Sequence, residues 1–268
     1  MSIQKMNNSW SPSFIDPSAT RFCKPRHTGV TMVMDKGLGL TQFTDLLQTT
    51  SEYIDFIKLG FGTSALYPPA ILHEKIQRAQ QHQVTVYPGG TFFELAYVQG
   101  KMEEYFAKAQ EWGFDTVEIS DGSIHLTRAE RDAAILTAKK IGLHVISECG
   151  KKASGSSIEE EEMKHTLTRD LECGAKYMLI EGRESGNNVG IYDANGQIDA
   201  RFIHEIKQTL GDFKDVLIWE APQKHQQVTL IKSFGTNVNL GNIPPQEVFS
   251  LESLRRGLRS DTFSGQRR

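Results

Sequence analysis

The sequence predicts a single (β/α)8 barrel whose active site lies at the C-terminal ends of its strands. Eight short apolar runs recur along the chain, and most of them end on an acid or a lysine before a turn that contains Gly or Pro. Amphipathic segments separate these runs. The runs lie at residues 32–36, 54–58, 84–90, 117–121, 145–148, 178–181, 217–220 and 237–242. Polar side chains gathered at the ends of eight parallel strands are typical of this fold.

Helix signals fill the intervals between the runs, in chain order. Pro68 and Pro69 suit the first turn of a helix that continues to about His82. At residues 127–130 and 157–160 a Thr or Ser is followed three residues later by Glu, which predicts two further helix starts. The glycines expected to end a helix just before the next strand are Gly113, Gly142 and Gly174. Short connections between alternating strands and helices predict parallel pairing with right-handed crossovers.

Length and composition favour one domain. The chain has 268 residues, 38% of them hydrophobic and 24% charged, with a formal net charge of -3. This length suits one barrel of ~250 residues, so we expect an N-terminal extension at residues 1–23 and the barrel at residues 24–268. We expect no nucleic-acid partner, because the net charge is weakly negative. We expect no membrane partner, because no apolar run approaches the ~20 residues of a membrane span.

The three cysteines, Cys23, Cys149 and Cys173, lie far apart and form no CxxC pair. This spacing argues against a disulfide framework or a zinc site and favours a reducing cytoplasm. Cys149 follows a strand-end glutamate, but no nearby His or clear helix start would lower its pKa for nucleophilic attack. The glycines after Asp35 lack the third glycine of a dinucleotide-binding loop, and neither HExxH nor GxSxG occurs.

Three carboxylates predict a metal site. Glu148, Glu181 and Glu220 each end one of three consecutive predicted strands. Neighbouring strands lie about 4.8 Å apart, so these groups could converge on a hard cation such as Mg²⁺. Alternatively, each could pair with a lysine or arginine in a buried ion network. Three uncompensated carboxylates would repel one another strongly.

Cations lie on the same rim and predict an anionic substrate. Lys58 lies inside an apolar run, where an unpaired ammonium would be costly. Lys151 follows a strand-end Glu and a Gly, and partial desolvation could depress its pKa to a value suited to proton transfer. Metal, lysine and Arg183 together would hold an anion that acids alone would repel.

A phosphate site is expected beside the last strand, because loops after strands seven and eight often bind phosphate in this fold. Asn239 and Asn242 could offer hydrogen-bond donors there, although Asn-rich turns are also common at strand exits. Arg256, in an arginine-rich segment at residues 254–262, could reach phosphate or sulfonate, or could pair with acids across a subunit interface.

Eight phrases at these strand ends occur in a specific order. They are KLGFGTS (58–64), YPGGT (87–91), EISDG (118–122), ISECGKK (146–152), IEGRESG (180–186), EAPQK (220–224), NVNLGNI (237–243) and LRRGLR (254–259). Together they resemble the phosphosulfolactate synthase family, and the match runs from about residue 24 to residue 263. Phe61 and Cys149 are small departures from the family pattern, which has a Trp and a small aliphatic residue there.

The resemblance implies a Mg²⁺-dependent cytoplasmic enzyme, assembled as a homo-oligomer, that adds sulfite to C3 of phosphoenolpyruvate. The product would be (2R)-phospho-3-sulfolactate, formed on one route to coenzyme M in methanogens and on a route to sulfolactate in bacteria. The expected roles are Lys151 and Lys58 as catalytic residues, with Lys151 as proton donor; Glu148, Glu181 and Glu220 around the metal; and Arg183, Asn239, Asn242 and Arg256 as substrate-binding residues.

Two alternatives stay open at this point. The family also includes plant heat-stress proteins, so the chain could be a non-catalytic barrel that acts in stress protection or protein interaction. A barrel aldolase with a Schiff-base lysine is the other alternative. Intact carboxylates and lysines along the whole rim favour the sulfite-adding enzyme.

Overall fold

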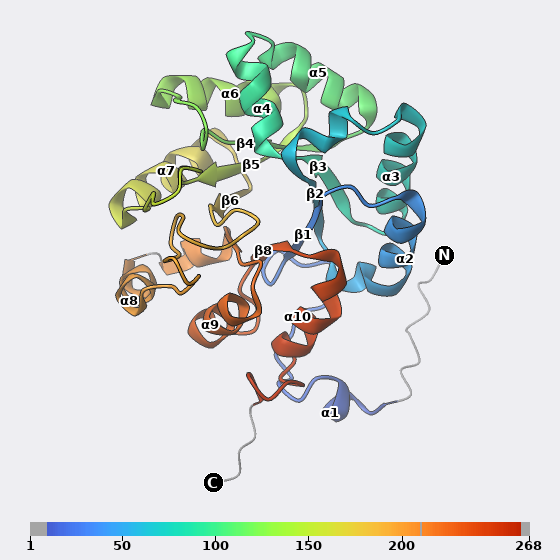
Figure 1. Ribbon diagram of the computed structural model, residues 1–268, viewed down its shortest axis with the longest axis vertical. Helices are drawn as coiled ribbons and strands as arrows, with labels where there is room; N and C mark the ends of the chain where they lie inside the picture. The colour runs from blue at the N-terminus through green and yellow to red at the C-terminus, as the bar shows by residue number, and fades with distance from the viewer. Residues whose placement is uncertain (1–9, 210, 264–268) are drawn as a thin grey trace.

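The computed structural model describes residues 10–209 and 211–263, and it confirms the (β/α)8 barrel (Figure 1). Its strands are β1 (Thr31–Asp35), β2 (Phe56–Leu59), β3 (Thr85–Pro88), β4 (Thr116–Ile119), β5 (His144–Cys149), β6 (Tyr177–Ile180), β7 (Leu217–Glu220) and β8 (Leu240–Ile243). They pair in parallel in the order β3-β2-β1-β8-β7-β6-β5-β4. The two end strands, β3 and β4, lie next to each other, so the barrel is nearly closed.

Helices form the outer ring around this sheet (Figure 1). They are α2 (Leu40–Thr50), α3 (Pro69–Gln81), α4 (Gly90–Val98), α5 (Met102–Trp112), α6 (Arg128–Lys140), α7 (Glu160–Cys173), α8 (Ala200–Thr209), α9 (Lys224–Phe234) and α10 (Val248–Arg255), preceded by the single turn α1 (Pro12–Ile15). Short 3-10 turns are η1 (Ser51–Tyr53), η2 (Gly60–Ala65), η3 (Gly211–Asp215) and η4 (Pro245–Glu247). No helix in these described ranges is long and apolar enough to cross a membrane.

Alternation along the strands divides the buried side chains into two cores. One set, which includes Met32, Ile146 and Leu179, fills the inside of the barrel, and a larger set lies between sheet and helices. Because successive side chains point to opposite faces of a strand, Glu148 and Glu181 come two positions after Ile146 and Leu179 on the inward face. The same alternation that builds the core therefore delivers the acids to the mouth of the barrel.

Most of the predicted helix ends are confirmed, and one is wrong. Thr127 and Glu130 form the expected capping box of α6, and α3 begins at Pro69. The second predicted box fails because α7 begins only at Glu160, with Glu159 as its N-cap residue and no side-chain cap. Ile158, which lies between the predicted cap Ser157 and the observed cap Glu159, is buried and precedes the helix.

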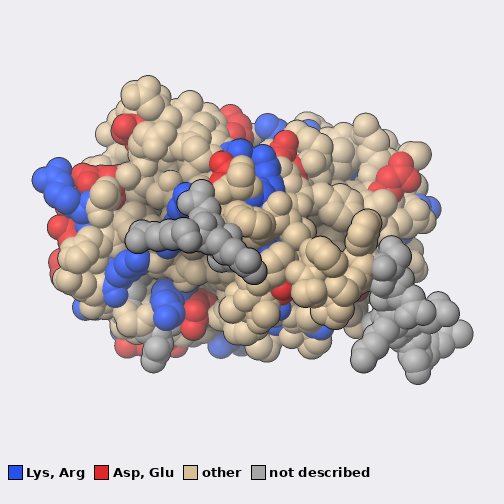
Figure 2. All heavy atoms as spheres, turned by 90° about the horizontal axis from the view of Figure 1, so that it is seen from below, with Lys and Arg blue, Asp and Glu red and all other residues tan. Residues whose placement is uncertain are grey.

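The end of the barrel opposite the rim is closed by the segment before β1. Arg21 is buried and forms an ion pair with Glu252 of α10 at 3.1 Å, and it also donates to the carbonyl of Gly29. Asn237 donates to the carbonyl of Thr20. The chain up to the predicted boundary at residue 23 thus includes residues bound to the barrel floor. On the face seen in Figure 2, acidic and basic groups are interspersed among uncharged residues.

Candidate active site

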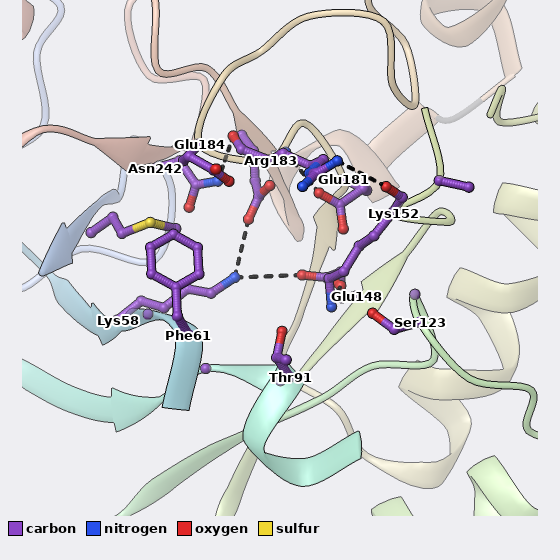
Figure 3. Close-up of a pocket in the computed structure, with 17 residues that line it drawn as sticks. Lys58, Phe61, Thr91, Ser123, Glu148, Lys152, Glu181, Arg183, Glu184 and Asn242 are labelled. Atoms are coloured by element: carbon purple, nitrogen blue, oxygen red, sulfur yellow. Dashed lines mark hydrogen bonds and ion pairs between the residues drawn. The ribbon is translucent and has the colours of Figure 1, made fainter. Parts of the chain in front are cut away.

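A cavity of about 550 Å³ opens at the C-terminal ends of the strands. Figure 3 shows charged side chains from several strands directed into it. Its lining residues are Met34, Lys58, Gly60, Phe61, Gly89, Gly90, Thr91, Gly122, Ser123, Glu148, Lys152, Ala153, Glu181, Arg183, Glu184, Glu220 and Asn242. The cavity lies where the fold carries its active sites, and its size is that of a small-molecule site.

Lys58 forms the centre of the cavity floor. Its ammonium nitrogen lies 3.0 Å from Glu118 Oε1, 3.1 Å from Glu220 Oε1 and 3.4 Å from Glu148 Oε2. Burial lowers the pKa of Lys58, but the three carboxylates outweigh it and hold that pKa well above the usual value. The alternative of a buried ion network is therefore what the structure shows for Glu148 and Glu220. All three N–H groups of Lys58 have carboxylate partners within reach.

A second cation, Lys152, enters the cavity from the loop after β5. Its ammonium lies 2.9 Å from Glu94 Oε1 and 3.0 Å from Glu148 Oε1, with a longer 3.4 Å contact to Ser120 Oγ. Burial lowers the pKa of Lys152, but Glu148 and Glu94 outweigh that effect and raise it above the usual value. Burial raises the pKa of Glu148, but its two cations, Lys152 and Lys58, outweigh burial and lower that pKa to about 2.

Glu181 differs from Glu148 in charge state. Burial, followed by repulsion from Glu148 and Glu220, raises the pKa of Glu181 to about 10, so this group carries a proton at neutral pH. Its Oε1 accepts from the backbone N–H of Arg183 at 2.7 Å. Glu181 Oε2 has no hydrogen-bond partner in the part of the chain that the structure describes. This buried oxygen, in a cavity that Glu148 also lines, is a place where a cation could bind.

Three residues on the cavity wall adopt left-handed backbone angles that favour glycine. Phe61, Arg183 and Asn242 have φ of 57°, 56° and 54°, and such conformations gather at functional sites. Asn242 Nδ2 donates to the carbonyl of Arg183 at 3.0 Å, and its Oδ1 is buried without a partner among the described residues. Phe61 and Arg183 follow β2 and β6, Asn242 lies near the end of β8, and all three residues line the cavity.

The predicted proton donor, Lys151, lies outside the cavity. Its ammonium contacts Asp121 Oδ2 at 2.7 Å and the carbonyls of Asp121 and Ile124, and 48% of its side chain is exposed. Gly150, in a left-handed conformation with φ of 124°, reverses the chain just before the lysine pair. Consecutive side chains diverge there, so Lys152 takes the inward path that the sequence analysis assigned to Lys151.

Two predicted substrate-binding residues lie at the end of the barrel opposite the cavity. Strand β8 begins at Leu240, later than predicted, so Asn239 precedes it and binds the carbonyls of Asp215 and Leu217 near the start of β7. Arg256 follows the last turn of α10 and pairs with Glu252 at 2.8 Å. A helix after a barrel strand runs back toward the strand starts, which carries Arg256 away from the rim.

The structure thus brings together Lys58, Glu148, Glu181, Arg183, Glu220 and Asn242, and it adds residues without a predicted role: Lys152, Glu94 and Ser120. Lys152 had a visible signal, because it is the second member of a lysine pair after a strand end. Glu94 had almost none, since it occurs alone in an apolar helix. Glu118 faces Lys58, whereas Asp121 pairs with Arg131 and Lys151.

The three predicted metal-binding carboxylates do not form a ready-made metal cage. Over the described ranges, no cluster of three or more His, Cys, Asp and Glu side chains could hold a metal ion. Both oxygens of Glu220 have partners, Lys58 and the N–H of Gly182. Glu148 is likewise paired with Lys58 and Lys152, but Glu181 Oε2 has no partner in the described ranges. Glu181 with Glu148 beside it still fits Mg²⁺, which is usually bound by one or two carboxylates together with water and substrate oxygens.

The family model of (2R)-phospho-3-sulfolactate synthase (ComA) matches residues 19–261, nearly the whole barrel. The chain belongs to this family. It is similar to the phosphosulfolactate synthase of Methanothermobacter thermautotrophicus, with 44% identity over 90% of this chain and 93% of the relative. It is 39% identical to that of Bacillus subtilis over 90% of this chain and 94% of the relative. It is 22% identical to Protein HEAT-STRESS-ASSOCIATED 32 of Arabidopsis thaliana over 87% of each chain.

Solved structures that resemble this family member support its fold. Dihydrodipicolinate synthase from Agrobacterium tumefaciens superimposes with a TM-score of 0.54 and 10% identity, covering 88% of this chain and 76% of that one. For 3-keto-L-gulonate-6-phosphate decarboxylase from Vibrio cholerae the TM-score is 0.53 at 10% identity, covering 85% and 97%. At such low identity the likeness concerns the barrel alone.

Gly122 should matter because the stem of Lys152 passes over it. A methyl group at Gly122 would lie 2.9 Å from Cγ and 3.0 Å from Cδ and Cε of Lys152. We expect Gly122→Ala to displace the ammonium and lower kcat by about 10- to 100-fold, the scale of a ~1 Å misplacement. Gly39→Ala is the matched control, because a methyl group there meets nothing within 4 Å. Steady-state kinetics would test this, and equal kcat for the two variants would contradict it.

Proposed function

We propose that this protein adds sulfite to phosphoenolpyruvate and forms (2R)-phospho-3-sulfolactate. The observation that carries the proposal is the family match over residues 19–261. The cavity supports it, because it combines an ammonium, an exposed arginine and a pair of buried carboxyl groups at the mouth of a barrel. Such a site suits a reaction in which negative charge first develops and is then quenched by a proton.

The chemistry balances as an addition. The sulfur lone pair of sulfite forms a bond to C3, and the C2–C3 π pair moves onto C2 and the substrate carboxylate. A proton then adds to C2 while the phosphate stays attached. We assign this proton to Lys152, whose ammonium lines the cavity, and bisulfite or solvent would return it. Arg183, Asn242 and Glu184, which also line the cavity, would orient the substrate.

Glu148 and Glu181 would hold a Mg²⁺ ion. The bound ion would supply positive charge that stabilises the negative charge developing on the substrate carboxylate. The fit rests on the buried Oε2 of Glu181, which has no hydrogen-bond partner among the described residues, and on the second carboxylate, Glu148, that lines the same cavity. Lys58 would hold Glu148 in place through their ion pair, and it would neutralise the neighbouring Glu118 and Glu220.

Lys152 needs a lower pKa than its carboxylate neighbours allow if it is to release a proton near neutral pH. Glu148 and Glu94 raise that pKa. A dication shared by Glu148 and Glu181 would weaken the attraction of Glu148 for the ammonium and bring the pKa down. Proton transfer is therefore expected to need the metal as well as the substrate.

The test is to incubate the purified protein with phosphoenolpyruvate and sulfite and to follow both by ³¹P NMR and mass spectrometry. We expect sulfite-dependent loss of phosphoenolpyruvate without release of inorganic phosphate, abolition by EDTA and recovery with added Mg²⁺. The absence of a sulfite adduct with any divalent cation would overturn the proposal and favour a non-catalytic role. A Schiff-base reaction at Lys58 is disfavoured, because its raised pKa keeps the amine protonated.

A further inference from the structure

Glu94 is a buried carboxylate in an otherwise apolar helix. It lies on α4, whose sequence is GTFFELAYV, and only 2% of its surface is exposed. Removing a carboxylate from water costs several kcal/mol unless good partners compensate. The partners of Glu94 therefore indicate why an acid occupies this place in α4.

The partners of Glu94 are Lys152, which lines the cavity, and Ser120, which contacts Lys152. Glu94 Oε1 accepts from Lys152 Nζ at 2.9 Å and from Ser120 Oγ at 2.5 Å. Ser120 follows β4 and is fully buried. Glu94 Oε2 has no partner in the described part of the chain. The negative charge of Glu94 is thus paired with Lys152, and Ser120 hydrogen-bonds the same carboxylate oxygen that accepts from Lys152.

Glu94 is one of two carboxylates that hold the Lys152 ammonium, and Glu148 is the other. Lys152 Nζ lies 2.9 Å from Glu94 and 3.0 Å from Glu148, and of these two ion pairs the one with Glu94 is also a hydrogen bond. Lys152 Nζ makes a further, longer contact of 3.4 Å to Ser120 Oγ. Without the charge of Glu94, Glu148 would be the sole close carboxylate, and the ammonium would move toward it.

We propose that Glu94, steadied by Ser120, is a positioning residue that holds Lys152 so that its remaining N–H reaches one face of the substrate at C2. The inference rests on the proposed function, because it assigns the geometry of the same proton transfer. Glu94 is not among the residues that line the cavity, so it acts on the substrate only through Lys152. Its effect passes through the place of the ammonium, so it should appear in the rate and in the configuration of the product.

The decisive variant is Glu94→Gln, which keeps the shape of the side chain and removes its charge. We expect kcat to fall about 30- to 100-fold, as for a ~1 Å misplacement, while KM for phosphoenolpyruvate changes less than about threefold. Chiral analysis of the phosphosulfolactate should show a mixture of 2R and 2S, because water can then protonate C2 from either face. Loss of folded protein alone would lower the yield and leave the product configuration unchanged.

Glu252→Gln is the matched control. Glu252 is also buried and paired with Arg21 and Arg256, but it lies at the opposite end of the barrel. We expect its folded fraction to retain the wild-type kcat and pure 2R product. If Glu94→Gln does not fold, Ser120→Ala should show the same mixed configuration with a smaller loss of kcat.

The outcomes separate the two proposals. An inactive wild-type protein overturns the proposed function, and the role of Glu94 falls with it. An active wild type whose Glu94→Gln variant, or Ser120→Ala in its place, keeps kcat and a pure 2R product overturns the positioning role alone.

Discussion

Replacing Lys58 by Met is expected to lower the free energy of unfolding by about 3–5 kcal/mol, the cost of breaking a buried ion pair by removing one partner. The variant would leave Glu118, Glu148 and Glu220 facing one another without the ammonium that lies within 3.4 Å of each. Because whole domains are stable by only about 5–15 kcal/mol, much of the stability would be lost. Urea denaturation followed by circular dichroism would measure this.

The deficit of the Lys58 variant should grow with pH. Burial already raises the pKa of Glu118 to about 7, against an ordinary value of about 4.3. An acid whose pKa is raised in the folded state binds its proton there more tightly than in the unfolded chain, so its contribution to stability falls as pH rises. Without Lys58 this pKa rises further, and we expect a larger deficit at pH 8 than at pH 5.

Lys151→Met is the matched control for this experiment. Its ammonium is half exposed and pairs with Asp121 at the surface, and exposed pairs contribute about 0–1 kcal/mol. A loss below about 1 kcal/mol is expected for it. Equal losses for the two variants would show that Lys58 is not the centre of a buried network.

Replacing Lys152 by Met is expected to lower kcat by about 10²- to 10⁴-fold, the usual contribution of a general acid. The same change at Lys151 should leave kcat within about threefold, because that ammonium contacts Asp121 and backbone carbonyls outside the cavity. The two variants differ by one position and remove the same charge. Steady-state kinetics on the folded fraction of each would check the assignment.

The reverse result would reassign the reaction. A large loss of kcat for Lys151→Met, with a normal kcat for Lys152→Met, would assign the role of proton donor to Lys151, the residue that the sequence pattern favoured. The loop after β5 would then have to turn its lysine pair over when substrate binds. Loss in both variants would indicate that the loop acts as a unit.

The barrel could be predicted from the sequence because its signals are local and repeated. Strand-like runs, helix caps such as Thr127 with Glu130, and glycines at helix ends each depend on a few neighbouring residues. The alternation of inward and outward side chains also placed Glu148 and Glu181 on the rim correctly. The errors at Asn239 and Ser157 came from element ends, where one or two residues decide which end of the barrel a side chain faces.

The sequence by itself therefore determined the fold, the family and the presence of acids and lysines at one rim. The tertiary structure decided which charges meet. It placed Lys58 among three carboxylates, chose Lys152 over Lys151 beyond Gly150, and moved Arg256 to the floor. Periodicity fixes the face of a strand to which a residue belongs. The residues that such a side chain contacts come from loops and helices far away in the chain, such as α4, and no local sequence pattern predicts those contacts.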